Sequence, residues 1–343
     1  MNQQSKNDHQ HDGRLLNVSI FRVISMLMIV LFHCMCYCSD YWQEYPCPVP
    51  DAVLRVVASF LVSLALPFFF FASGFLYAFI YQDKNGYRNW TAFLVNKLKR
   101  LILPAISWTV ICLLLLPFKY SVRELLAGIM HLWFLPALFF IFMMARLMSP
   151  WLMDRRKPLV DVVLLCGLVL MAYLIFVAYM WSGVDDGFLF GRIMTSVGYF
   201  LAGMMMYKLR ISFSHKPLEL IILILLLGWH AVNLNVQMYA LQALVDNYVI
   251  IAISALALDL LSSVKPKRDS VTSRVLNSLD KNSLGIYLVH QVLIMTLFQY
   301  TQFEESFLTF HPRIGTAVLF LLVLPISWGL AELKRRAKLE PYL

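Results

Sequence analysis

The chain has 343 residues, of which 60% are hydrophobic and 14% are charged, and its formal net charge is +9. This balance excludes an ordinary soluble globular domain and indicates a protein that crosses a membrane many times. The positive charge does not indicate a nucleic-acid partner, because the basic residues alternate between loops as they do in membrane proteins.

Apolar stretches of about twenty residues, the length that spans a bilayer, recur along the whole chain. We expect an all-α fold, a polytopic membrane bundle of about ten transmembrane helices in one domain at 15–332. It is flanked by a disordered cytoplasmic tail at 1–14 and a basic cytoplasmic tail at 333–343. The expected spans are 15–38, 52–81, 100–117, 131–148, 159–181, 190–207, 218–237, 240–261, 283–300 and 314–332.

The distribution of Lys and Arg predicts the orientation of the chain. With both termini in the cytoplasm, the cytoplasmic segments hold 22 of these residues and the opposite segments hold 4. Such an asymmetry is typical of the positive-inside rule. We therefore expect both termini inside the cell.

Arg22 and His33 are ionisable residues inside the first apolar span, FRVISMLMIVLFH. A charged side chain at mid-membrane costs roughly 2.5–3.5 kcal/mol on insertion scales, so both are expected to face the protein interior. Eleven residues place them about 16 Å apart along the helix and about 20° apart around it. One face then carries a cation toward the cytoplasm and an imidazole toward the outside. The alternative is an arginine that reaches the interface and a histidine that bonds a neighbouring helix.

The cysteines around the first loop leave two interpretations open. Cys38 and Cys47 would lie on the outer side, where an oxidising compartment allows a disulfide, and inert thiols are the alternative. No metal site is expected, because no histidine or acidic cluster in that stretch completes a ligand set.

The second and third spans carry two further motifs. Ser73 and Gly74 lie within PFFFFASGFLYAF, where small residues typically allow helices to approach closely. Ser73 is outside any G-x-S-x-G motif, which gives no support for a hydrolase nucleophile. Lys97, Lys99 and Arg100 then form a basic cluster in NKLKRLILP, which the positive-inside rule alone also explains.

Two later motifs contain histidines. HLWFLPALF places His131 and Trp133 at the outer interface, where a histidine can orient a sugar or assist a base, and where a solvated histidine is equally expected. NSLGIYLVHQ places His290 about a third of the way into the ninth span from the cytoplasm. His290 is thus a second histidine within the membrane.

The order of these motifs resembles that of the acyltransferase-3 family of bacterial integral membrane O-acyltransferases. The matching elements are Arg22-x10-His33, FFFFASGF, Arg100-x3-Pro104, HLWFLPALF, GYFLAG at 198–203 and SLGIYLVH ending at His290. The family often has Arg-x-x-Arg in the third-span cluster. Here the first arginine is replaced by Lys97, which keeps the charge and loses bidentate phosphate geometry.

The resemblance implies transfer of an acyl group, often acetyl, from cytoplasmic acyl-CoA to a hydroxyl of a cell-envelope glycan or lipid-linked sugar at the bacterial inner membrane. It also implies that the first-span histidine is catalytic, that the arginine before it is essential and that the basic cluster binds the donor. Acetyl-CoA is then a donor substrate, and no permanently bound cofactor or metal is expected.

The residue chemistry agrees with this hypothesis. An imidazole with a pKa near 6.5 is suited to take a proton from a sugar hydroxyl and to return one to the CoA thiolate, so His33 is the candidate general base. Transient acylation of His33 is left open. The candidates for the CoA phosphates are Arg22, Lys99 and Arg100, and those for the acceptor are His131, Trp133, His290 and Ser73.

Two other functions compete with this one. Buried charges and histidines also line the paths of transporters, so a transporter or flippase of a lipid-linked sugar is the alternative. Against it, the two halves of the chain show no corresponding pair of interrupted helices. A structural or sensory subunit ranks last, and it predicts that Arg22 and His33 tolerate substitution.

Overall fold

The computed structural model describes residues 3–42, 45–84, 86–87, 89–154, 157–183, 189–234, 240–264 and 270–339, without the side chains of 3–15 and 240. The described residues form helices and no strands, and ten of the helical segments are long and apolar enough to cross a membrane. The expected all-α membrane bundle is confirmed. The helices are α1 (Gln3–Met35), α2 (Ala52–Gln82), α3 (Trp90–Lys97), α4 (Leu103–Leu115), α5 (Val122–Ala127), α6 (Phe134–Leu152), α7 (Pro158–Ser182), α8 (Leu189–Lys208), α9 (Lys216–Asn233), α10 (Ala240–Leu260), α11 (Val271–Thr301) and α12 (Pro312–Arg336).

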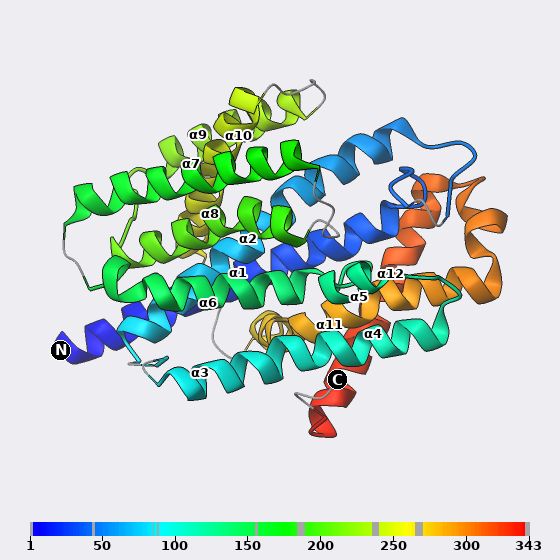
Figure 1. Ribbon diagram of the computed structural model, residues 1–343, viewed down its shortest axis with the longest axis horizontal. Helices are drawn as coiled ribbons and strands as arrows, with labels where there is room; N and C mark the ends of the chain where they lie inside the picture. Colours follow the sequence, from blue (N-terminus) through cyan, green and yellow to red (C-terminus); the bar gives the residue numbers. More distant parts are fainter. Residues whose placement is uncertain are drawn as a thin grey trace.

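The bundle has buried central helices and more exposed peripheral helices. In the view of Figure 1, α1, α2 and α8 lie between α7 and α9 at the top and α3 and α4 at the bottom. In α8, 78% of the most apolar stretch is buried, and the value for α1 is 61%. In α9 and in the span 90–115 the value is only 17%. The peripheral helices expose Leu, Ile and Val side chains, as expected of surfaces that face lipid. The residues that carry chemistry are therefore sought in the centre.

Gly74 and Gly203 allow the backbones of α2 and α8 to pack in direct contact at the centre of the bundle. A Cβ at Gly74 would lie 1.9 Å from the Phe200 carbonyl oxygen, and a Cβ at Gly203 would lie 1.9 Å from that of Phe71. Each helix therefore needs a glycine where the backbone of the other approaches. This is the close approach that small residues permit between membrane helices.

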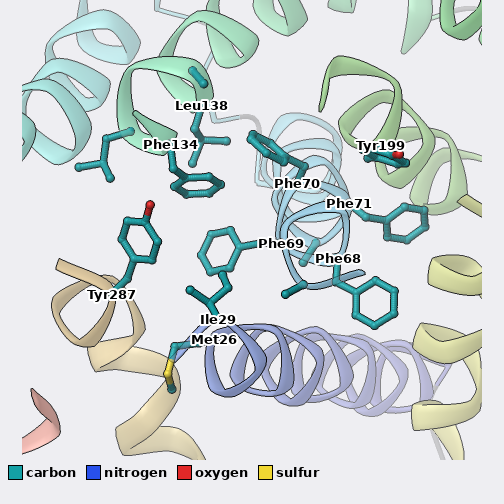
Figure 2. Packing of buried hydrophobic residues seen from close by; sticks show 14 of the residues in the cluster. Met26, Ile29, Phe68, Phe69, Phe70, Phe71, Phe134, Leu138, Tyr199 and Tyr287 are labelled. Carbon is teal, nitrogen blue, oxygen red and sulfur yellow. The ribbon is translucent and has the colours of Figure 1, made fainter. Parts of the chain in front are cut away.

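The phenylalanine run of α2 packs in several directions at once (Figure 2). Phe68 stacks near Phe21 of α1 with ring centres 4.7 Å apart, and Phe70 lies 4.9 Å from Phe134 of α6. The Phe134 ring in turn lies 5.3 Å from that of Tyr287 on α11. The aromatic run thus fixes α1, α6 and α11 around one helix.

Two spans begin earlier than expected. The third starts at Trp90, where the Asn89 side chain accepts from the Ala92 N–H, and it passes through a π-helical turn at Leu98–Ile102. The ninth starts at Val271, where Ser270 caps the helix. Hydropathy misses the third start because Lys97, Lys99 and Arg100 interrupt the apolar residues of that span, and it misses the ninth because the first turns of α11 are polar. Caps stabilise both starts locally.

The two expected tails partly continue the helices. The backbone of 3–14 belongs to α1, and α12 extends to Arg336, so that 333–336 is helical. Residues 1–2 and 340–343 lie outside the described residues. The cytoplasmic placement of both tails stays a prediction.

The six cysteines are free thiols. The Cys38 Sγ donates to the Leu308 carbonyl at 3.9 Å, and burial raises the pKa of Cys38 to about 11. Burial also raises the pKa of Cys47. Because the thiolate is the reactive form, these thiols are poorly reactive at neutral pH.

Candidate functional site

Arg22 and His33 both reach from α1 to α11. The Arg22 Nη2 donates to the Ser283 hydroxyl at 3.1 Å, and the Nη1 pairs with the Asp280 carboxylate at 3.3 Å. The Nδ1 of His33 lies 3.0 Å from the Nε2 of His290. The two side chains therefore lie on one face of α1, about 16 Å apart along the helix.

A cavity of about 350 Å³, here called the histidine cavity, opens beside His33. It is bounded by α1, α2, α11, the loop after α1 and the turn before α6. Its lining residues are Ile29, Phe32, His33, Tyr41, Trp42, Val62, Leu66, Met130, His131, Trp133, Tyr287, Gln291 and Met295. It is mostly aromatic and aliphatic with a few polar groups, which is typical of a small-molecule site.

The hydrogen bonds around His290 define the tautomer of His33. The His290 Nδ1 lies 3.1 Å from the Ile286 carbonyl, which can only accept, so neutral His290 carries its hydrogen there. Its Nε2 therefore accepts, and the Nδ1–H of His33 donates to it while also facing the Ile29 carbonyl at 3.0 Å. The His33 Nε2 is left with a free lone pair. Because His33 lines the histidine cavity, its Nε2 can act as a base toward a substrate bound there.

His131 is the third histidine of the cluster. Its ring centre lies 6.2 Å from that of His33 and 5.3 Å from that of His290. The His131 Nε2 donates to the Leu288 carbonyl at 3.3 Å, and Tyr287 donates its hydroxyl to the His131 carbonyl. The Nδ1 of His131 is buried without a hydrogen-bond partner in the described part of the chain. Because His131 lines the cavity, its Nδ1 is a second unpaired acceptor among the lining residues.

A second cavity of about 480 Å³, here called the basic pocket, lies at the Arg22 end of the bundle. Its lining residues are Arg22, Asn96, Lys99, Arg100, Pro104, Lys281, Ser283, Leu284, Gly285 and Lys334. Five of these are cations and none is acidic. Such a set favours a ligand that carries several negative charges, as phosphates do.

The π-helical turn at Leu98–Ile102 separates Lys97 from the basic pocket. Lys99 and Arg100 line the pocket, whereas the buried Lys97 ammonium lies 3.3 Å from the ring centre of Phe142 and 4.9 Å from that of Tyr87. A π-turn inserts one extra residue per turn and thereby redirects side chains. Lys97 is a cation held by aromatic faces, away from the pocket.

The structure thus sorts the residues proposed from sequence. It brings Arg22, Lys99 and Arg100 together in the basic pocket, and His33, His131 and Trp133 together at the histidine cavity. Ser73 is buried in α2 and lines neither cavity.

The expected depth of His290 is wrong. It lies 3.0 Å from His33, near the far end of α1, because α11 begins twelve residues earlier than expected and His290 is the twentieth of its 31 residues. His290 is buried behind His33 and acts on it directly.

Sequence reasoning missed many of the lining residues. They include Tyr41, Trp42 and Gln291 at the histidine cavity and Lys281 and Lys334 at the basic pocket. Only Gln291 carried a signal, since it directly follows His290.

No group of three or more His, Cys, Asp or Glu side chains among the described residues is placed to hold a metal ion. The family model of the acyltransferase-3 family, described as an acyltransferase domain, matches residues 15–332. No curated protein and no solved structure matches the chain. The match covers all ten candidate membrane spans of the described residues except the end of the last, 333–336. The chain therefore belongs to the acyltransferase-3 family and is a multi-pass membrane acyltransferase.

Proposed function

We propose that the protein transfers an acyl group, acetyl in the first instance, from cytoplasmic acyl-CoA to a hydroxyl of a cell-envelope glycan or lipid-linked sugar. The observation that carries this proposal is the hydrogen-bond chain from Ile286 through His290 to His33, which leaves the His33 Nε2 lone pair at a cavity. General bases need such a fixed tautomer within reach of the proton that they abstract.

The reaction follows from that geometry. The acceptor hydroxyl attacks the thioester carbonyl carbon while its proton moves to the His33 Nε2, and a new C–O bond forms. The C–S bond then breaks, and the CoA thiolate receives the proton from His33. The imidazolium that forms in between is stabilised by the Ile29 carbonyl and the His290 ring, which both face its Nδ1.

The basic pocket is the proposed donor site. Arg22, Arg100 and Lys99 would hold the phosphates of acyl-CoA, together with Lys281 and Lys334. The positive-inside rule assigns this end to the cytoplasm of a bacterial inner membrane, where acyl-CoA is made. The histidine cavity then faces the envelope side. The thioester of acyl-CoA would have to reach His33, about 16 Å along α1 from the phosphates at Arg22.

The test is transfer of radiolabel from acetyl-CoA into the envelope glycan fraction by membranes with matched amounts of wild-type protein or the His33→Ala variant. Label with the wild type and none with the variant is the expected result. The control is His311→Ala, which removes an exposed histidine that lines neither cavity.

The other outcomes separate the alternatives. Equal label with wild type and His33→Ala, above membranes without the protein, would keep the acyltransferase and remove His33 from its mechanism. No label in either, together with no saturable binding of acetyl-CoA by the purified protein, would contradict the donor and favour a transporter of lipid-linked sugar.

A further inference from the structure

Gln291 is a lining residue of the histidine cavity, and it carries a buried polar atom that has no hydrogen-bond partner in the described chain. Its side chain lines the cavity, the residue is 3% exposed, and its Oε1 has no hydrogen-bond partner. The His131 Nδ1, also at the cavity, is in the same state. Buried polar groups without partners are rare in native proteins, because losing water without replacement is costly. Two such atoms at one cavity point to a ligand.

The atoms specify what that ligand must offer. The Oε1 of Gln291, the Nδ1 of His131 and the Nε2 of His33 all accept hydrogen bonds. None of the described lining residues is Asp, Glu, Lys or Arg. The lining also holds N–H donors, in the indoles of Trp42 and Trp133 and in the Gln291 amide. Acceptors and donors without permanent charge fit a neutral group with several hydroxyls, each of which can donate and accept. An anionic ligand would find no cation in this lining.

The wall of the cavity fits a ring with apolar faces. Trp42 stacks on His33 with ring centres 6.3 Å apart, and Trp133 also lines the cavity. The Arg192 guanidinium lies 4.3 Å from the Trp133 ring centre and packs against it from outside the lining. Aromatic faces of this kind give contact area to the C–H face of a sugar while its hydroxyls reach polar groups.

We propose that Gln291 determines acceptor specificity, its Oε1 accepting a hydrogen bond from a second hydroxyl of the neutral sugar ring whose first hydroxyl faces His33. This rests on the proposed function. His290 and Gln291 are neighbours on α11, so the same helix orients the His33 base and contacts the acceptor sugar. The side chain of His290 contacts His33, and that of Gln291 lines the cavity.

The test follows the logic of a double-mutant cycle: the Gln291 amide and each acceptor hydroxyl are removed separately and then together. The purified full chain in lipid nanodiscs receives acetyl-CoA and octyl β-D-glucoside, or the analogues that lack the 2-, 3-, 4- or 6-hydroxyl. Rates are compared between the wild type and Gln291→Met, which removes the amide at nearly constant volume. Gln291→Glu keeps an acceptor oxygen, and Gln299→Met is the matched control on the same helix, outside the cavity lining.

We expect one deoxy analogue to lose about 10- to 100-fold in kcat/KM with the wild type. With Gln291→Met the parent glucoside should lose a similar factor, and that same deletion should cost nothing more. Gln291→Glu should recover part of the loss, and KM for acetyl-CoA should stay the same in all variants.

Two results would overturn the proposal. The first is an equal loss for every acceptor in Gln291→Met, which would indicate a structural role. The second is wild-type protein that consumes acetyl-CoA in a His33-dependent reaction and yet acylates none of the glucosides, which would remove the neutral sugar while keeping the transferase. Absence of acetyl-CoA consumption would overturn both.

Discussion

The hydrogen-bond networks of His33 and His230 differ in whether a ring nitrogen is left unbonded beside a cavity. The ring of His230 bonds the Asp246 carboxylate through Nδ1 at 2.8 Å and the Ser63 hydroxyl through Nε2 at 2.7 Å. By residue type this is the arrangement of a hydrolase triad. Yet neither the histidine cavity nor the basic pocket is lined by any of the three residues.

The His33 network has no carboxylate, but it leaves a lone pair at a cavity. The Ser63 hydroxyl, by contrast, also bonds the Phe60 carbonyl at 2.9 Å. The His230 network thus joins α2 to α9 and α10 as interhelical hydrogen bonds do in membranes. The comparison teaches that residue types alone do not identify a catalytic histidine. A catalytic histidine is identified by an unprotonated, accessible ring nitrogen beside a cavity that can hold the substrate.

The strongest test of this difference is to delete each histidine. His33→Ala should lower acyl transfer by about 10²- to 10⁴-fold, the usual contribution of a general base. His230→Ala should leave the rate per folded molecule unchanged. Initial rates are normalised to the monodisperse fraction from size-exclusion chromatography. A comparable loss in both variants would break the comparison.

Asp246 should matter for stability instead. Asp246→Ala leaves the buried His230 Nδ1 without its partner and should cost about 3 kcal/mol of unfolding free energy. Thermal unfolding in detergent measures the change. Asp246→Asn retains an acceptor oxygen and should cost less. Unfolding at the wild-type temperature in both variants would contradict the structural role.

Arg100 tests the basic pocket against the histidine cavity. Arg100→Ala should raise KM for acetyl-CoA by about 10- to 100-fold, because a charge-assisted hydrogen bond to phosphate is lost. Added salt should weaken the wild type more than the variant. KM for the acceptor should not change. The control is Arg313→Ala, which removes a cation outside the pocket lining.

His290 should act through the tautomer of His33. His290→Leu removes the acceptor of the His33 Nδ1–H and should lower kcat about tenfold, with both KM values unchanged. His290→Asn offers an amide oxygen and should recover part of the rate. The pH–rate profile should shift with the substitution. An unshifted profile with unaltered kcat would exclude this positioning role.

Substitution of Asp51 should give the smallest effect, a change in unfolding temperature that depends on pH. The Leu54 N–H and the Arg313 guanidinium hold the pKa of Asp51 below its ordinary value. Its contribution to stability is therefore complete above about pH 4, the unfolded value, and is lost as the pH falls below it. Asp51→Asn should lower the unfolding temperature slightly at pH 7. The difference from wild type should shrink below about pH 4.

Sequence reasoning predicted the helices better than the cavities. Apolar length predicted ten spans, because backbone groups in lipid must be satisfied within a helix. It missed the first turns of the spans that begin at Trp90 and Val271, because three cations interrupt the first of these spans and polar residues fill the start of the second. Those turns are stabilised by the Asn89 and Ser270 caps, and hydropathy does not measure caps.

The candidate site was partly predictable for a similar reason. The spacing of Arg22 and His33 follows from one helix and gave their common face. The partners of His33 come from α11 and from the turn before α6, so no local pattern could place them at one depth. Lys334 could not be assigned, because a basic helix end has no distinctive sequence signal, and the only signal for Gln291 was its position directly after His290.

The mutual lock of Gly74 and Gly203 has a consequence for motion. Each backbone occupies the space that a side chain would need on the other helix, so α2 and α8 cannot slide or rotate past each other without first separating. The two helices must therefore move as one rigid body. Any opening that admits the donor or releases the product has to occur elsewhere in the bundle than between α2 and α8.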